Sequence, residues 1–242
     1  MTESDIQIGL EPEEPRGIAA IPSVQIYLLL FLLIGYPLLS VVMSLVNNPD
    51  TAKVTSRIGQ IYLPSLLIQI IILTLVILVL RRTATPLAAI GLSKEDVNWA
   101  NLVAALIFLA GAWTMILILR SAIMRSGYIP EKDFLFLLPR TLPEKGFWLA
   151  LSIGAALSEE IAFRGYIITR LRILTGRYWM GALVSSLAFS LGHLYQGLAG
   201  VILTFVYGLL FAGLFVARKS IVPGIIAHFL QDALVLFTLA QM

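Results

Sequence analysis

The sequence contains no cysteine and very little charge for its length. Of its 242 residues, 13% are charged and 59% are apolar, with a mean hydropathy of +0.92. The missing cysteines exclude disulfides, thiolate catalysis, cysteine-ligated zinc and palmitoylation. A soluble domain carries roughly 25% charged residues, so this chain lacks the polar groups needed to cover a globular surface. We therefore expect an integral membrane protein that has the lipid bilayer as a partner.

The excess of positive charge is small, because 17 basic residues are balanced by 14 acidic ones. This balance favours a topological role for Lys and Arg in the loops, and we expect no nucleic-acid partner. Residues 1–24 are mostly polar and acidic, unlike the basic and then apolar pattern of a secretory signal. We interpret them as a solvated N-terminal tail. The composition leaves the oligomeric state unknown.

Seven apolar stretches are long enough to cross a membrane as helices of about 20 residues. They cover residues 25–46, 59–80, 100–119, 148–169, 180–196, 199–217 and 222–241. No stretch alternates as barrel strands do, so the prediction is an all-α, polytopic transmembrane bundle. The long connection at 120–147 contains the apolar run 134–138, which is too short to span and indicates an interfacial or re-entrant piece. An eighth crossing within this connection stays open.

Basic residues in the connections give a prediction of orientation. With seven crossings, one side of the membrane collects nine of them: Arg16, Arg81, Arg82, Lys94, Arg170, Arg172, Arg177, Arg218 and Lys219. The other side collects seven: Lys53, Arg57, Arg120, Arg125, Lys132, Arg140 and Lys145. The positive-inside rule then places the N-terminus in the cytoplasm. We expect a multi-pass protein of a bacterial-type cell membrane.

Ionisable residues inside the predicted spans are few and gather in the C-terminal part of the chain. They are Glu159, Glu160, Arg164, His193, His228 and Asp232, and they include both histidines of the sequence. Because an ionisable group at bilayer depth is costly unless it is paired or hydrated, each is a candidate functional residue. Counted from the shared basic flank of their helices, four of them lie at similar depths of roughly 12–20 Å. One polar site near the middle of the bilayer is predicted.

Helical spacing predicts which of these side chains share a face. Glu160 and Arg164 are four residues apart and can form an ion pair. Glu159 points about 100° away from Glu160 and is free to meet another partner. His228 and Asp232 are also four residues apart and face the same way. Taken alone, the Glu160–Arg164 pair could also be a purely structural ion pair that fixes helix position.

Three motifs in this order resemble the CPBP family of intramembrane proteases. They are Glu159-Glu160-x-x-x-Arg164, Phe189-x-x-x-His193 and His228-x-x-x-Asp232. The family includes the type II CAAX prenyl endopeptidases and proteins associated with bacteriocin immunity. The resemblance covers residues 150–235. It implies a division of the chain into the tail (1–24), N-terminal transmembrane helices with the interfacial loop (25–145) and catalytic transmembrane helices (146–242).

The resemblance implies a role for each motif residue. Glu159 would be the general base that activates a water, with His193 as its partner. His228 and Asp232 would orient the water or stabilise the oxyanion. The prenyl endopeptidases usually carry Asn at the position of Asp232, and an ionised Asp cannot donate a hydrogen bond to an oxyanion.

The supporting residues of the predicted site are Glu160, Arg164 and Phe189, the first two of which would tie the helices together. Whether the site uses a metal stays open. Two histidines and carboxylates could bind Zn²⁺ or another divalent ion, and the candidate ligands are Glu159, His193, His228 and Asp232. Equally, the site could work with no cofactor.

The predicted function is an intramembrane endopeptidase that acts on a membrane-anchored peptide or protein, with a prenylated CAAX-type C-terminus as one substrate class. A second hypothesis is a non-catalytic immunity or scaffold protein that binds a peptide or partner in the same cavity. A third is an ion-coupled transporter that uses Glu159 and Asp232. The sequence shows no inverted repeat, which disfavours transport.

Overall fold

The computed structural model describes residues 16–46, 54–127 and 137–238, and these residues form helices joined by short connections, with no strand among them. The first helices are η1 (Ile18–Ala20), α1 (Ser23–Leu30), η2 (Phe31–Gly35), α2 (Tyr36–Val46), η4 (Ile58–Tyr62), α3 (Leu63–Arg82), η5 (Leu87–Ile90) and α4 (Trp99–Arg125). The C-terminal helices are α5 (Leu142–Glu159), η7 (Glu160–Ile167), α6 (Ile168–Thr175), α7 (Tyr178–Leu191), η8 (Leu194–Gln196), α8 (Gly197–Arg218) and α9 (Val222–Thr238).

These helices confirm the predicted polytopic bundle. Five continuous stretches are long and apolar enough to cross a membrane: Ser23–Val42, Ile58–Arg82, Trp99–Arg125, Leu142–Thr175 and Leu194–Arg218. The apolar helices α7, with 14 residues, and α9, with 17, are shorter. Each of the seven predicted spans therefore corresponds to a helical stretch. The chain is an integral membrane protein.

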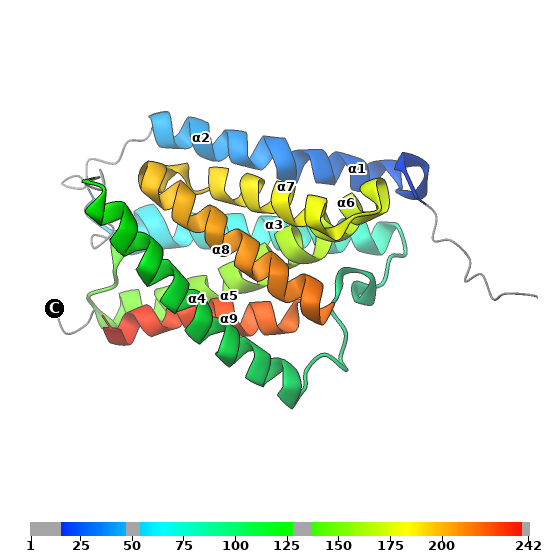
Figure 1. The fold of residues 1–242 in the computed structure, drawn as a ribbon. Helices are drawn as coiled ribbons and strands as arrows, with labels where there is room; N and C mark the ends of the chain where they lie inside the picture. Colours follow the sequence, from blue (N-terminus) through cyan, green and yellow to red (C-terminus); the bar gives the residue numbers. More distant parts are fainter. Residues whose placement is uncertain (1–15, 47–53, 128–136, 239–242) are drawn as a thin grey trace, which may run out of the picture.

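The rod formed by α5, η7 and α6 lies at the centre of the bundle. It contacts α3 and α9 along α5, and α7 along α6 (Figure 1). Helix α4 crosses the bundle obliquely and contacts both α8 and α9. Every residue of η7 is buried, so the middle of the rod is surrounded by protein. This central position brings η7, which carries Glu160 and Arg164 of the predicted first motif, into contact with α3, α7 and α8.

Local sequence signals fix both ends of the central rod. Thr141 and Glu144 form a reciprocal capping box, in which each side chain accepts a hydrogen bond from the other residue's backbone. At the other end, Gly176 adopts a left-handed conformation (φ 72°) that ends α6. The rod is thus longer than the predicted span 148–169. As a result Arg170, which we expected in a basic connecting loop, lies buried in α6.

The segment after α7 differs from the prediction of a span over 180–196. Helix α7 ends at Leu191, and the turn that follows contains His193. Helix α2 covers this turn, where the Ser40 hydroxyl donates to the Gly192 carbonyl at 2.5 Å. Apolarity alone could not mark this helix end, because the turn residues Leu194 and Tyr195 are themselves apolar.

The predicted interfacial run 134–138 is only partly within the described residues, because 134–136 lie outside them. Leu137 is described, and its carbonyl accepts a hydrogen bond of 2.6 Å from the Tyr62 hydroxyl. Between Arg125 at the end of α4 and Leu142 at the start of α5 there remain residues 126–141. Residues 128–136 of this stretch, where an eighth crossing was left open, lie outside the described residues.

Candidate active site

Two adjacent glutamates lie where the central rod changes its helical form. Glu159 is the last residue of α5, and Glu160 begins the π-helical segment η7. Both are buried, with exposed fractions of 7% and 1%. Isolated π-helical turns within α-helices often occur at functional sites, because they alter the direction of neighbouring side chains.

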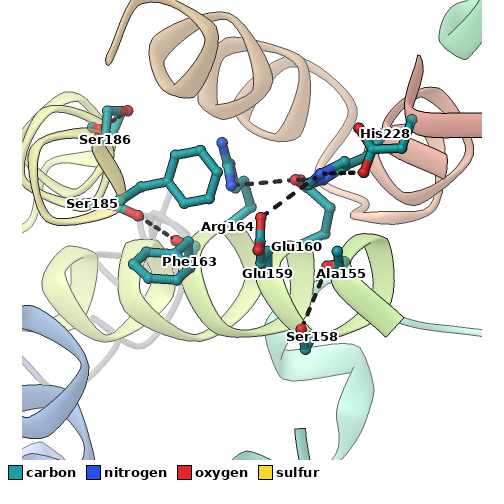
Figure 2. Close-up of polar contacts among 12 residues, drawn as sticks. Ala155, Ser158, Glu159, Glu160, Phe163, Arg164, Ser185, Ser186 and His228 are labelled. Carbon is teal, nitrogen blue, oxygen red and sulfur yellow. Dashed lines mark hydrogen bonds and ion pairs between the residues drawn. The ribbon is translucent and has the colours of Figure 1, made fainter. Parts of the chain in front are cut away.

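Glu160 holds the predicted ion pair with Arg164. Arg164 Nη1 lies 3.2 Å from Glu160 Oε1, and both side chains are almost completely buried (Figure 2). This nitrogen has no aligned hydrogen-bond acceptor among the described residues, so the contact is an ion pair by proximity. The guanidinium also lies 4.3 Å from the Phe189 ring centroid and 5.3 Å from that of Phe211. Aromatic faces thus stabilise a cation that is withdrawn from water.

His228 from α9 lies between the two glutamates. Its Nδ1 is 3.1 Å from Glu160 Oε1, within hydrogen-bond distance, whereas its Nε2 is 3.7 Å from Glu159 Oε2 (Figure 2). A carboxylate can only accept, so Nδ1 donates to Glu160. The other ring nitrogen is then the one directed toward Glu159. Both glutamates, although on different sides of the rod, therefore converge on one imidazole.

Close packing of α9 against η7 makes this contact with His228 feasible. Gly224 lies one turn before His228, and a Cβ atom on it would be 2.8 Å from Glu160 Oε2. Such a distance is too short for a side chain, so the glycine lets α9 approach the glutamate. The sequence prediction did not include this residue.

Asp232 occupies the predicted position beside His228. Its Oδ2 lies 3.7 Å from His228 Nε2, and its side chain is 30% exposed. Its backbone carbonyl accepts a 2.8 Å hydrogen bond from the Trp148 indole, which links α9 to α5. The indole of Trp148 therefore has a defined partner inside the bundle.

Among the described residues, His193 forms no hydrogen bond or ion pair with the other ionisable residues of the predicted site. Its Nδ1 contacts the Phe189 carbonyl at 2.9 Å, and its ring is 4.6 Å from the Phe189 ring. Among the described residues no hydrogen bond or ion pair joins it to Glu159, the partner that the family resemblance implies. Phe189 links it indirectly to Arg164. Because a carbonyl accepts, Nδ1 is the donor and Nε2 stays available for a water or substrate.

Two side chains of the site were missed by the sequence analysis. Gln69 of α3 donates a 2.8 Å hydrogen bond from Nε2 to Glu159 Oε1, and Phe211 of α8 packs against both Arg164 and His228. A search for ionisable groups finds neither. A neutral amide in the middle of an apolar run is the signal that could have identified Gln69.

The donor set does not match a preformed metal centre. Within 16–46, 54–127 and 137–238, no three His, Asp or Glu side chains are arranged to hold one ion. Of the predicted ligands, His228 already contacts three carboxylates, whereas the described polar contact of His193 is with the Phe189 carbonyl. The residues present therefore do not fit a three-ligand site.

Comparison with known proteins finds a family match over the C-terminal part of the chain. Residues 142–234 match the family described as type II CAAX prenyl endopeptidase Rce1-like. This segment belongs to the Rce1-like family. The matched segment runs from the start of α5 into α9, so it contains every motif residue of the candidate site. Searches of curated proteins and of solved structures found no match.

The Rce1-like family is a protease family, which supports a peptidase among the function classes considered. Helices α1, α2, α3 and α4 lie outside the matched segment. Their contribution to the site comes from the structure alone. The contact between Gln69 and Glu159 is one such contribution.

Proposed function

We propose that the protein is an intramembrane endopeptidase in which Glu159 activates a water for attack on a peptide carbonyl. The observation that carries the proposal is the separation of 3.7 Å between His228 Nε2 and Glu159 Oε2. This is longer than a direct hydrogen bond, and both atoms can contact one water beside them. The Rce1-like family of the segment supports peptide hydrolysis as the reaction.

In the proposed reaction Glu159 accepts a proton in the first step and donates it in the second. Glu159 removes a proton from the water while the oxygen of the water forms a bond to the carbonyl carbon. The carbon–nitrogen bond then breaks, and Glu159 returns the proton to the leaving amine. His228 orients the water through Nε2, because Glu160 holds its Nδ1–H. Asp232 stabilises the orientation of the same ring from 3.7 Å.

His193 is proposed to act from the turn between α7 and α8. Its engaged Nδ1 leaves Nε2 able to accept a hydrogen bond from the substrate or the water. It belongs to the second motif of the family resemblance, and Phe189 connects it to the rest of the site. We assign no step to a metal.

The proposed substrate is a membrane-associated peptide or protein, and a prenylated CAAX-type C-terminus is the first candidate to test. Burial of Glu159 and His228 within helices of the bundle favours a substrate that reaches the site from the bilayer. The family description supports this substrate class. The N-terminus is proposed to face the cytoplasm of a bacterial-type cell.

The deciding experiment compares membrane-protein termini in cells that express the wild type or Glu159→Gln at matched levels. A matched control is Glu95→Gln, which makes the same exchange at an exposed carboxylate. New termini with wild type and Glu95→Gln, but not with Glu159→Gln, are expected. Identical termini in all three strains, with Glu159→Gln still active in any deletion phenotype, would overturn the enzyme and favour a binding scaffold.

A further inference from the structure

Gln69 is a buried polar residue in the middle of the apolar helix α3. It is 8% exposed, and α3 lies outside the segment that matches the protease family. An amide inside an apolar helix is unfavourable unless its donor and acceptor groups are both satisfied. The partners of Gln69 therefore explain why such a residue can occupy this position.

Both ends of the Gln69 amide have partners on the central rod. Nε2 donates to Glu159 Oε1 at 2.8 Å, and Oε1 accepts a hydrogen bond from the Ser158 hydroxyl. Ser158 is fully buried, so its hydroxyl has no competing bulk water. The serine therefore determines which way the amide faces, and the amide in turn contacts the glutamate.

A glycine of α5 allows α3 to approach closely enough for these contacts. A Cβ atom on Gly154 would lie 2.8 Å from Leu66 Cδ1 and 3.7 Å from Gln69 Cβ. Gly154 precedes Ser158 by one helical turn and so lies on the same face of α5. A larger side chain here would push α3 away from Glu159.

We infer that Gln69 is a positioning residue for the proposed general base. Its hydrogen bond holds one oxygen of Glu159, Oε1, on the α3 side of the rod. The other oxygen, Oε2, then stays directed toward His228 Nε2. This inference rests on the proposed function. It assigns part of the catalytic geometry to the N-terminal helices, which the family match does not cover.

The test uses Gln69→Met, which keeps side-chain length and removes both hydrogen bonds. Gln25→Met is the matched control, because Gln25 is also buried and donates hydrogen bonds to the hydroxyls of Thr83 and Thr85. Thr83, which follows the last residue of α3, lies about 21 Å along the helix from Gln69 at the helical rise, away from the site. Each variant is purified in detergent, and its kcat, KM and thermal midpoint are measured on a peptide found in the termini comparison.

We expect Gln69→Met to lower kcat by roughly 10- to 100-fold, as a misplaced catalytic group does, with KM within about twofold. Gln25→Met should lower the thermal midpoint and leave kcat within about twofold. Ser158→Ala keeps the hydrogen bond that Gln69 donates to Glu159 but removes the one that its amide oxygen accepts, and should lower kcat by a smaller factor. If Gln69→Met does not accumulate, the kcat of Ser158→Ala is measured in its place.

Two results would overturn the inference. One is a kcat of folded Gln69→Met that equals that of the wild type. If Gln69→Met does not accumulate, a wild-type kcat of Ser158→Ala has the same meaning. The other is a loss of kcat that is the same in Gln69→Met and Gln25→Met, which would indicate a general effect of stability. In either case cleavage by the wild type leaves the proposed function intact. If the wild type and Glu159→Gln give the same termini, both the proposed function and the positioning role of Gln69 are refuted.

Discussion

His228 Nδ1 lies 3.1 Å from Glu160 Oε1, so a carboxylate of the central rod holds the imidazole of the last helix. The same carboxylate oxygen is 3.2 Å from Arg164 Nη1. Glu160 therefore has one oxygen shared between a guanidinium and an imidazole from two different helices. Glu160 thus fixes the position of His228, and the chemistry that we propose falls to its neighbour Glu159.

Removal of Glu160 alone should destabilise the fold. Glu160→Ala leaves the Arg164 cation buried without its counter-ion, and breaking such a pair typically costs about 3–5 kcal/mol. The double variant Glu160→Gln with Arg164→Met should be less destabilised, because no unpaired charge remains. Thermal unfolding in detergent measures both. Equal destabilisation of the single and double variants would contradict this account of the pair.

Gly224→Ala should impair cleavage without abolishing folding. The new methyl group would lie 2.8 Å from Glu160 Oε2 and would move α9 or the carboxylate. Overpacking of this kind costs about 1–3 kcal/mol. Gly213→Ala is the control, because a Cβ on Gly213 meets nothing within 4 Å. The prediction fails if both variants cleave substrate at the wild-type rate.

Asp232→Asn should retain most of the cleavage activity. The side-chain amide of Asn can donate a hydrogen bond to His228 Nε2, and Asn is the usual residue of the prenyl endopeptidases at this position. Asp232→Leu offers no polar atom to the ring and should lower kcat by about 10-fold or more, within the range for a mispositioned group. Steady-state kinetics of both variants decides. A larger loss of kcat in Asp232→Asn than in Asp232→Leu would assign a different role to Asp232.

Chelation should leave cleavage unchanged. The described residues offer no group of three His, Asp or Glu side chains around one point. Purified protein treated with a strong zinc chelator is assayed, and its metal content is measured by mass spectrometry. If the untreated protein holds one equivalent of metal, and the chelator removes this metal together with the activity, the zinc alternative would instead be supported.

The general architecture could be predicted because length and apolarity decide whether a helix can span a bilayer. The same reasoning failed where a helix end is not marked by polarity, as at Leu191, and where a charged residue continues a helix, as Arg170 does in α6. Helix α6 ends at the left-handed Gly176, whereas the turn after Leu191 is held against α2 by the hydrogen bond between Ser40 and Gly192. A window of hydropathy contains no information on either feature.

The candidate site was partly predictable for a similar reason. The Glu160–Arg164 pair follows from a spacing of four residues, and the structure confirms it. The convergence of Glu159 and Glu160 on His228 depends on how α5, η7 and α9 pack, and Gln69 is a neutral residue that charge analysis passes over. The catalytic roles of these residues stay predictions.

The π-helical segment η7 has a further consequence for the central rod. Each wider turn takes up extra residues, so the faces of α5 and α6 no longer follow from one continuous 3.6-residue count. Deleting a single residue between 160 and 167 would rotate one half of the rod relative to the other by about 100°. Either the acidic pair or the buried surface of α6 would then face the wrong neighbour. The number of residues in η7 therefore determines the geometry of the site as much as its side chains do.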